Sequence, residues 1–212
     1  MNKRKFMIVI IALIVIAALI YYFRIRNSGV GMNPNITNED NKTGSTTVDS
    51  ERTLVVYFSH SGNTQKLAKE ISDQVGGDFR RIEEKNPYPT GNSLYSYTKD
   101  EQEKDARPEM KPLDIDMSDY DTIFIGYPIW WYTYPQIILT FFDKYDVTGK
   151  TIVPFVTHGG SGMSGTEQNM SNYLNDKNVT VLDGLAVRDR DMSKDQSNTV
   201  TEWLNRLEIK QK

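Results

Sequence analysis

The sequence predicts an α/β fold, a doubly wound three-layer sandwich, from three observations. Short apolar runs alternate with segments of helical periodicity after residue 52. Two runs, TIFIGYP and TIVPFVTH, are nearly continuous hydrophobics, as in strands buried on both faces of a parallel sheet. Three of the runs are followed by loops rich in Gly, Ser or aromatic residues, and open parallel sheets bind their ligands at such strand ends.

Residues 1–26 have the pattern of a membrane anchor. The span 6–23, FMIVIIALIVIAALIYYF, contains no charge, proline or glycine. As a helix it would extend over roughly 27 Å, close to the hydrocarbon core of a bilayer at about 30 Å. A signal peptide is the alternative, because the KRK start suits both. Its apolar region would be shorter and would end in a small-residue cleavage site, whereas this run ends in YYF followed by Arg24 and Arg26.

We therefore expect a single-pass, uncleaved anchor in the cell membrane. More positive charge precedes the span than follows it, which favours a cytoplasmic N-terminus and an extracytoplasmic globular domain. Residues 27–51, rich in Asn, Ser, Thr and Gly, read as a flexible polar linker. The globular domain is expected over residues 52–209.

Charge and cysteine content exclude two classes of protein. Beyond the five basic residues of positions 1–26, the chain carries 20 basic and 28 acidic residues, a net charge of −8. Such a domain is unlike a nucleic-acid-binding protein. The chain has no cysteine, so a domain stapled by disulfides is excluded. Two histidines and no cysteine offer no recognisable metal-ligand spacing, and no metal is expected.

The individual elements follow from local patterns. Apolar runs predict five strands, at Thr53–Phe58, Phe79–Glu83, Thr122–Gly126, Thr151–Thr157 and Val179–Val187, with a possible break of the last at Asp183-Gly184. Helical spacing gives four apolar faces: Leu67, Ala68, Ile71 and Val75; Ile137, Ile138, Phe141 and Phe142; Met170, Tyr173 and Leu174; and Val200, Trp203, Leu204 and Leu207.

Residues 85–119 interrupt this alternation. They are too polar and proline-rich for a plain connection, and predict a surface excursion with a short helix around Ser93–Lys104. Tyr88, Tyr95 and Tyr97 of this excursion either cover a ligand or pack the loop down.

The first unusual loop, SHSGNT at 59–64, follows a strand and precedes a helix. The free N–H groups and the dipole of a helix N-terminus favour an anion, and Ser61 and Thr64 would add hydroxyl donors. Neither G-x-x-x-x-G-K-[ST] nor G-x-G-x-x-G is present, so a terminal monophosphate fits better than a triphosphate or dinucleotide. The alternative is an ordinary Ser or Asn cap of the helix.

The other two loops have features of a site for a flat ligand. YPIWWYTYP places Trp130 and Trp131 at a strand end, where aromatic rings form flat walls. Two adjacent tryptophans point in different directions, so at least one should face outward. THGGSGMSG allows the backbone to approach a polar ring edge closely, or acts as a hinge.

These three loops, in this order, resemble the flavodoxin family, and in particular its short bacterial branch with P-x-W-W and G-G-S-G loops. The most specific motif is T/S-x-T/S-G-x-T, here Ser59 to Thr64. The resemblance implies non-covalent binding of FMN on a five-stranded parallel sheet of order 2-1-3-4-5. It implies cofactor-binding residues Ser59, His60, Ser61, Gly62, Asn63 and Thr64 at the phosphate, Pro128, Ile129, Trp130, Trp131 and Tyr132 beside the isoalloxazine, and Thr157, His158, Gly159, Gly160, Ser161 and Gly162 at its pyrimidine edge.

The chain departs from the family pattern at Tyr132, where many relatives have glycine, and in its expected anchor. In flavodoxins a flexible peptide at this position stabilises the one-electron-reduced flavin. The bulky Tyr132 puts that role in doubt, so a two-electron redox cycle is the alternative for this chain. His158 either donates to the flavin or is an ordinary hydrogen-bonded loop histidine.

Three functions remain open at this point. The first is a membrane-tethered electron carrier that needs no catalytic residue, with a partner protein or a quinone as its redox partner. The second is an FMN-dependent quinone or NAD(P)H oxidoreductase, with Arg188 and Arg190 as candidates for contacting a nicotinamide phosphate. The third is a non-redox interaction module on the same fold.

Overall fold

The computed structural model describes residues 52–212, which contain one twisted parallel sheet. Strands β1 (Thr53–Tyr57), β2 (Asp78–Arg81), β3 (Thr122–Pro128) and β4 (Thr151–His158) lie in the order β2-β1-β3-β4. Two short strands, β5 (Thr180–Val181) and β6 (Leu185–Arg188), both pair in parallel with β4 and share the fifth position. The predicted order 2-1-3-4-5 is confirmed.

The fifth strand is broken at the expected place, and side chains from two helices hold the break. The backbone N–H of Gly184 donates to Glu167 Oε1 at 2.7 Å, and Trp203 Nε1 donates to the carbonyl of Asp183 at 3.0 Å. The end of Met163 lies against Gly184, where a Cβ would overlap it. Three residues, 182–184, therefore separate the end of β5 from the start of β6, and the chain pairs with β4 again from Leu185.

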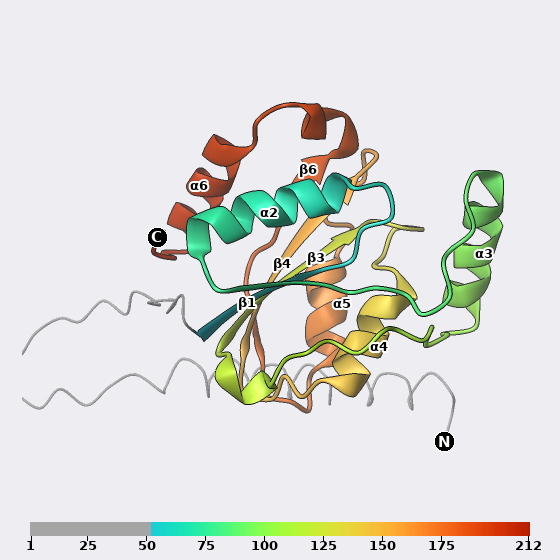
Figure 1. Ribbon diagram of the computed structural model, residues 1–212, viewed down its shortest axis with the longest axis horizontal. Helices are drawn as coiled ribbons and strands as arrows, with labels where there is room; N and C mark the ends of the chain where they lie inside the picture. The colour runs from blue at the N-terminus through green and yellow to red at the C-terminus, as the bar shows by residue number, and fades with distance from the viewer. Residues whose placement is uncertain (1–51) are drawn as a thin grey trace, which may run out of the picture. The chain divides into compact units, whose positions relative to one another are not determined.

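Helices cover both faces of the sheet and give the three expected layers (Figure 1). Helices α2 (Asn63–Val75) and α6 (Ser197–Arg206) cover one face, and α4 (Gln136–Lys144) and α5 (Thr166–Tyr173) the other. Short 3-10 turns η2 (Met117–Asp119) and η3 (Asp189–Ser193) precede β3 and α6.

Successive side chains of each central strand enter opposite cores, because a strand alternates its faces. Leu54 and Val56 of β1 join the cluster under α4 and α5, whereas Val55 and Tyr57 join the cluster under α2 and α6. All four predicted helical faces lie in these two clusters, either buried or packed against their edges.

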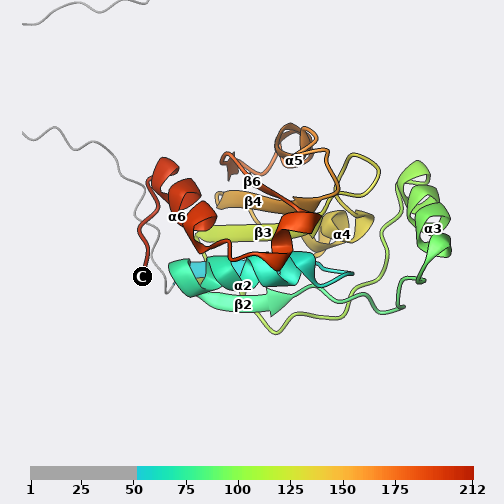
Figure 2. The same cartoon turned by 90° about the horizontal axis from the view of Figure 1, so that it is seen from above.

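The excursion at residues 85–119 contains helix α3 (Asn92–Glu103), as predicted. It stands beyond the edge of the sheet at which the strands end (Figure 2). Within residues 52–212 no helix is both long and apolar enough to cross a membrane. The anchor expected at 6–23 and the linker at 27–51 lie outside the described residues.

Gly126 offers a test of the packing between β3 and β4. Its register partner on β4 is Phe155, and a Cβ at position 126 would overlap the fully buried Phe155 ring. We expect Gly126→Ala to lower the free energy of unfolding by roughly 1–3 kcal/mol, the usual cost of overpacking a core, in a urea titration.

Gly159→Ala is the matched control, because a Cβ there meets no atom within 4 Å. It should leave the midpoint nearly unchanged. Equal midpoints for the two variants would show that the Phe155 ring moves aside and that the β3–β4 packing is not rigid.

Candidate functional site

The carboxyl ends of β1, β3 and β4 bring the three unusual loops together. The hydroxyls of Thr64 and Thr157, both buried, lie 2.9 Å apart and share a hydrogen bond. The backbone N–H of Ile129 donates to the carbonyl of Thr157 at 2.9 Å. The rings of His60 and Trp130 meet edge to face at 5.9 Å. Each loop is thus joined to another by a direct contact.

The first loop leaves the start of α2 open. Gly62, at φ +90°, is the residue that caps α2, and no side chain caps this helix. Ser59, buried, accepts the N–H of Gly62 through Oγ at 3.1 Å and so fixes the turn. In the part of the chain that the structure describes, the backbone N–H groups of Ser61, Asn63 and Thr64 have no hydrogen-bond partner. The Ser or Asn cap considered from the sequence is therefore absent from α2, and its N-terminus can accept an anion.

Two side chains of this loop have different surroundings. Ser61 is exposed beside the open N–H groups, free to donate to a ligand. Asn63 instead donates through Nδ2 to Asp189 Oδ1 at 3.0 Å, which ties the loop to η3. Below the loop, Arg81 donates to the carbonyl of Ser59 at 3.0 Å.

The second loop folds as a tight two-residue turn. Trp130 and Thr133 exchange two backbone hydrogen bonds at 2.9 and 3.0 Å. The central residues, Trp131 and Tyr132, have φ values of +50° and +62°, so this is a type I′ turn. Glycine or asparagine usually occupies such positions, because other side chains are strained there.

The two tryptophans point in different directions, as expected. Trp130 packs inward, edge to face with Phe58 at 5.5 Å and with Tyr88 at 5.2 Å. Trp131 points to α3, where its Nε1 donates to Thr98 Oγ1 at 3.1 Å.

The excursion contributes both to packing and to the site. Tyr88 is buried, and its hydroxyl donates to Glu101 Oε2 at 3.0 Å. Burial raises the pKa of both groups. Tyr95 is 64% exposed and faces the site, whereas Tyr97 packs on Tyr88. Of the two roles considered for these tyrosines, Tyr88 packs the loop and Tyr95 is placed to cover a ligand.

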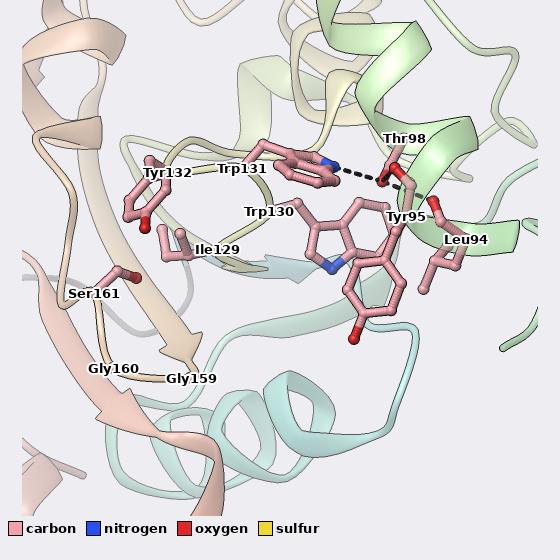
Figure 3. A pocket seen from close by; sticks show the side chains of 10 residues that line it. All are labelled: Leu94, Tyr95, Thr98, Ile129, Trp130, Trp131, Tyr132, Gly159, Gly160 and Ser161. Carbon is pink, nitrogen blue, oxygen red and sulfur yellow. Dashed lines mark hydrogen bonds between the residues drawn. The ribbon is translucent and has the colours of Figure 1, made fainter. Parts of the chain in front are cut away.

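A pocket of about 470 Å³ lies between α3 and the second and third loops (Figure 3). Its size is within the usual range for small-molecule sites. It is lined by Leu94, Tyr95 and Thr98 of α3, by Ile129, Trp130, Trp131 and Tyr132, and by Gly159, Gly160 and Ser161. Sequence reasoning missed Leu94 and Thr98. Their spacing of four residues in the expected helix 93–104 was the available signal.

His158 lies beneath the third loop and not in this pocket. Its Nδ1 accepts the N–H of Gly162 at 2.9 Å, which requires that this nitrogen carry no proton. It lines a separate cavity of about 480 Å³ together with Arg188 and residues of η3 and α6. Burial lowers the pKa of His158, and Arg188 acts in the same direction against Asp189. A direct contact between His158 and the cofactor stays a prediction.

A helix N-terminus with open N–H groups, near an aromatic pocket at the carboxyl edge of a 2-1-3-4-5 sheet, is the arrangement expected of a mononucleotide-binding α/β protein. A family model described as flavodoxin matches residues 52–207. The chain belongs to the flavodoxin family, and this membership supports FMN as its cofactor.

Solved structures agree with this assignment. A candidate flavoprotein from Bacteroides eggerthii is 31% identical, with a TM-score of 0.63, and the match covers 75% of this chain and 99% of that one. A second, from Bacteroides uniformis, is 31% identical over 73% of this chain and 97% of that one, with a TM-score of 0.62. A flavoprotein from Lactobacillus acidophilus, solved with FMN, shares the fold at 21% identity and a TM-score of 0.57, covering 71% and 99%. No curated protein gives a significant match.

The hydrogen bond between Gly162 and His158 predicts a pH-dependent stability. Because the folded state lowers the pKa of His158, the unfolded chain takes up a proton that the folded chain resists. This contribution is complete above the ordinary histidine pKa of about 6.5 and is lost as the pH falls from there towards the lowered value. We expect the Tm of the wild type, followed by circular dichroism, to fall over this range.

His158→Asn is the informative comparison, since its side-chain oxygen can accept the same N–H without titrating. The difference in Tm between wild type and variant should change below about pH 6.5 and stay constant above it. Glu101 titrates in both proteins and cancels in the difference. If the Tm of the two proteins changed in parallel at every pH, protonation of His158 would not destabilise the folded state, and this prediction would be wrong.

Proposed function

We propose that this chain is an FMN-binding electron-transfer protein. The observation that carries the proposal is the open N-terminus of α2 beside a pocket with aromatic walls. The N–H groups of Ser61, Asn63 and Thr64 with the Ser61 hydroxyl would hold the phosphate, and the pocket would take the isoalloxazine. The flavoprotein from Lactobacillus acidophilus, solved with FMN, and membership of the flavodoxin family support this assignment.

Bound FMN supplies the redox chemistry, and the residues of the chain bind, orient and shield it. Trp130 is held on three sides by the rings of Phe58, His60 and Tyr88, which makes it a rigid wall. Gly159 and Gly160 leave room for the backbone of the third loop to approach a polar edge. No proton-transfer residue is required for the carrier function.

An NAD(P)H-dependent oxidoreductase is less well supported by the geometry. Arg188 lines the separate cavity that contains His158, and Arg190 lies 3.9 Å from Asp191 on the exposed turn η3. Neither arginine lines the pocket between α3 and the loops. A nicotinamide dinucleotide placed there would leave its phosphates without these cations.

FMN binding can be tested with a single charge. Ser61 is exposed, so Ser61→Glu should fold normally while placing a carboxylate beside the phosphate. When FMN binds to the wild-type apoprotein, we expect the fluorescence of both the flavin and the tryptophans to be quenched with a stoichiometric end point. The Ser61→Glu variant should bind FMN at least tenfold more weakly, a loss of about 1.4 kcal/mol. Riboflavin, which has no phosphate, should lose little affinity in the same variant.

Ser96→Glu is the matched control, because it adds the same charge at another exposed serine, on α3 and outside the pocket. It should bind both flavins as the wild type does. If Ser61→Glu lost the same affinity for FMN as for riboflavin, the phosphate of FMN would not bind at this loop. If the wild type binds no FMN at micromolar concentration, the chain is better understood as an interaction module on a flavodoxin fold.

We also propose that the domain is tethered to the cell membrane through residues 6–23 and faces the extracytoplasmic side. The support is the sequence alone: an uncharged span of bilayer length between basic flanks, followed by a polar linker.

The tether predicts how the chain fractionates. The full chain should sediment with membranes, resist extraction by carbonate and high salt, and be released by detergent. A chain that begins at residue 50 should stay in the supernatant. Protease added to intact spheroplasts should degrade the domain if it faces outward. Release of the full chain by carbonate would exclude a spanning anchor.

A further inference from the structure

A second cavity lies beside β6, apart from the pocket that the flavin would occupy. Its volume is about 480 Å³, and its wall consists of His158 at the end of β4 and of residues between Ala186 and Thr199. These residues belong to β6, to η3 and to the first turn of α6. The cavity shares no lining residue with the pocket between α3 and the loops, and the proposed function gives it no role.

His158 presents an unpaired donor to this cavity. The residue is only 6% exposed, and its Nδ1 accepts the N–H of Gly162, so the proton of the neutral ring is on Nε2. Within residues 52–212 no hydrogen bond is formed by this Nε2, yet no fully buried side-chain nitrogen or oxygen is left without a partner. The Nε2–H edge is therefore the accessible part of the ring, and the ring lines the cavity, where it can donate to a ligand.

Arg188 lies next to His158 and supplies a positive charge. The two residues are paired in register on β6 and β4, so their side chains leave the same face of the sheet. Arg188 is exposed, and its guanidinium takes part in no hydrogen bond or ion pair in the part of the chain that the structure describes. A guanidinium beside an N–H donor is a suitable pair for binding an oxyanion such as a carboxylate.

The start of α6 adds backbone donors to the same cavity. Thr199 lines the cavity, and Gln196, the residue that caps α6, makes no side-chain bond to the helix. Among the described residues, the backbone N–H groups of Asn198 and Thr199 have no hydrogen-bond partner. Free N–H groups and the dipole of a helix N-terminus favour negative charge, in agreement with the donors of the other two residues.

The acidic side chains in the wall already have partners, and they limit the charge that a ligand can carry. Asp195 accepts the backbone N–H and the hydroxyl of Ser197, both at 2.9 Å, and Asp191 accepts from Lys194 at 2.9 Å. The wall therefore holds two carboxylates and two cations, and Arg188 is the one of these four that is not paired. A ligand with a single negative charge suits this balance, whereas the two carboxylates would repel a dianion.

We propose that the cavity beside β6 is a second ligand site, which binds the carboxylate of a small monocarboxylic acid. The guanidinium of Arg188 and the Nε2–H of His158 hold the carboxylate, and the N-terminus of α6 favours its charge. Ala186 and Val187 give the wall apolar surface for a short hydrocarbon body. This inference does not rest on the proposed function, because no residue of the flavin pocket takes part.

The test follows the histidine itself, in the full chain in detergent. Proton–nitrogen correlation spectra of the imidazole rings record both histidines of the chain, and His158→Asn identifies the signal that belongs to His158. The titration is made at about pH 7.5, where the ring is neutral because burial holds its pKa below the ordinary value of about 6.5. Butyrate, added at constant ionic strength, should shift the His158 nitrogens saturably. Butyramide, which has the same shape without the charge, should bind at least fivefold more weakly, and this comparison needs no variant.

Arg188→Gln should weaken butyrate at least fivefold. Arg190→Gln is the matched control, because it removes a nearby exposed arginine that does not line the cavity, and it should change the affinity less than twofold. Inorganic phosphate, mostly a dianion at this pH, should bind more weakly than butyrate. The absence of a saturable shift of His158, equal binding of butyramide, equal losses in the two arginine variants, or tighter binding of phosphate would each overturn the inference.

Discussion

The hydrogen bond between Thr64 and Thr157 is the contact on which the arrangement of the site depends. It joins the start of α2 to the end of β4, and both residues are 1% exposed. A buried hydroxyl that loses its partner costs about 1–3 kcal/mol, so neither residue can be moved independently. Because the carbonyl of the same Thr157 also accepts from Ile129, one residue of β4 fixes the anion loop and the aromatic loop at once.

Helix α3 of the excursion at residues 85–119 is part of the pocket. The loops that follow β3 and β4 supply one wall of the pocket, and α3 supplies the other through Leu94, Tyr95 and Thr98. Three side-chain contacts hold this helix in place: the Thr98 hydroxyl with Trp131, the Glu101 carboxylate with Tyr88, and Gln102 with the Trp131 carbonyl at 3.4 Å. A polar segment of unusual composition is thus part of the site, since its inner face meets aromatic residues of both the excursion and the second loop.

Local patterns predicted the elements of the fold, and the contacts between distant residues account for what they left out. Continuous apolar runs and helical spacing are local signals, so strands, helices and even the break at Asp183-Gly184 were readable. Thr98 meeting Trp131, or Asn63 meeting Asp189, joins residues 33 and 126 positions apart, and no local pattern contains that information. The same limit explains His158: its place after β4 was clear, but the direction of its ring depends on Gly162 and on the cavity beside β6.

Tyr132 occupies a turn position where many members of the family have glycine, and the structure shows the physical consequence. The turn is held by two backbone hydrogen bonds between Trp130 and Thr133, so its shape does not depend on which side chain occupies position 132. Glycine would fit that shape without strain, whereas tyrosine is strained and gains a ring that stands in solvent beside the pocket. The strain is small compared with the stability of a domain of this size, roughly 5–15 kcal/mol. The chain can therefore tolerate it, and a ring that contributes nothing to the core is free to take part in binding.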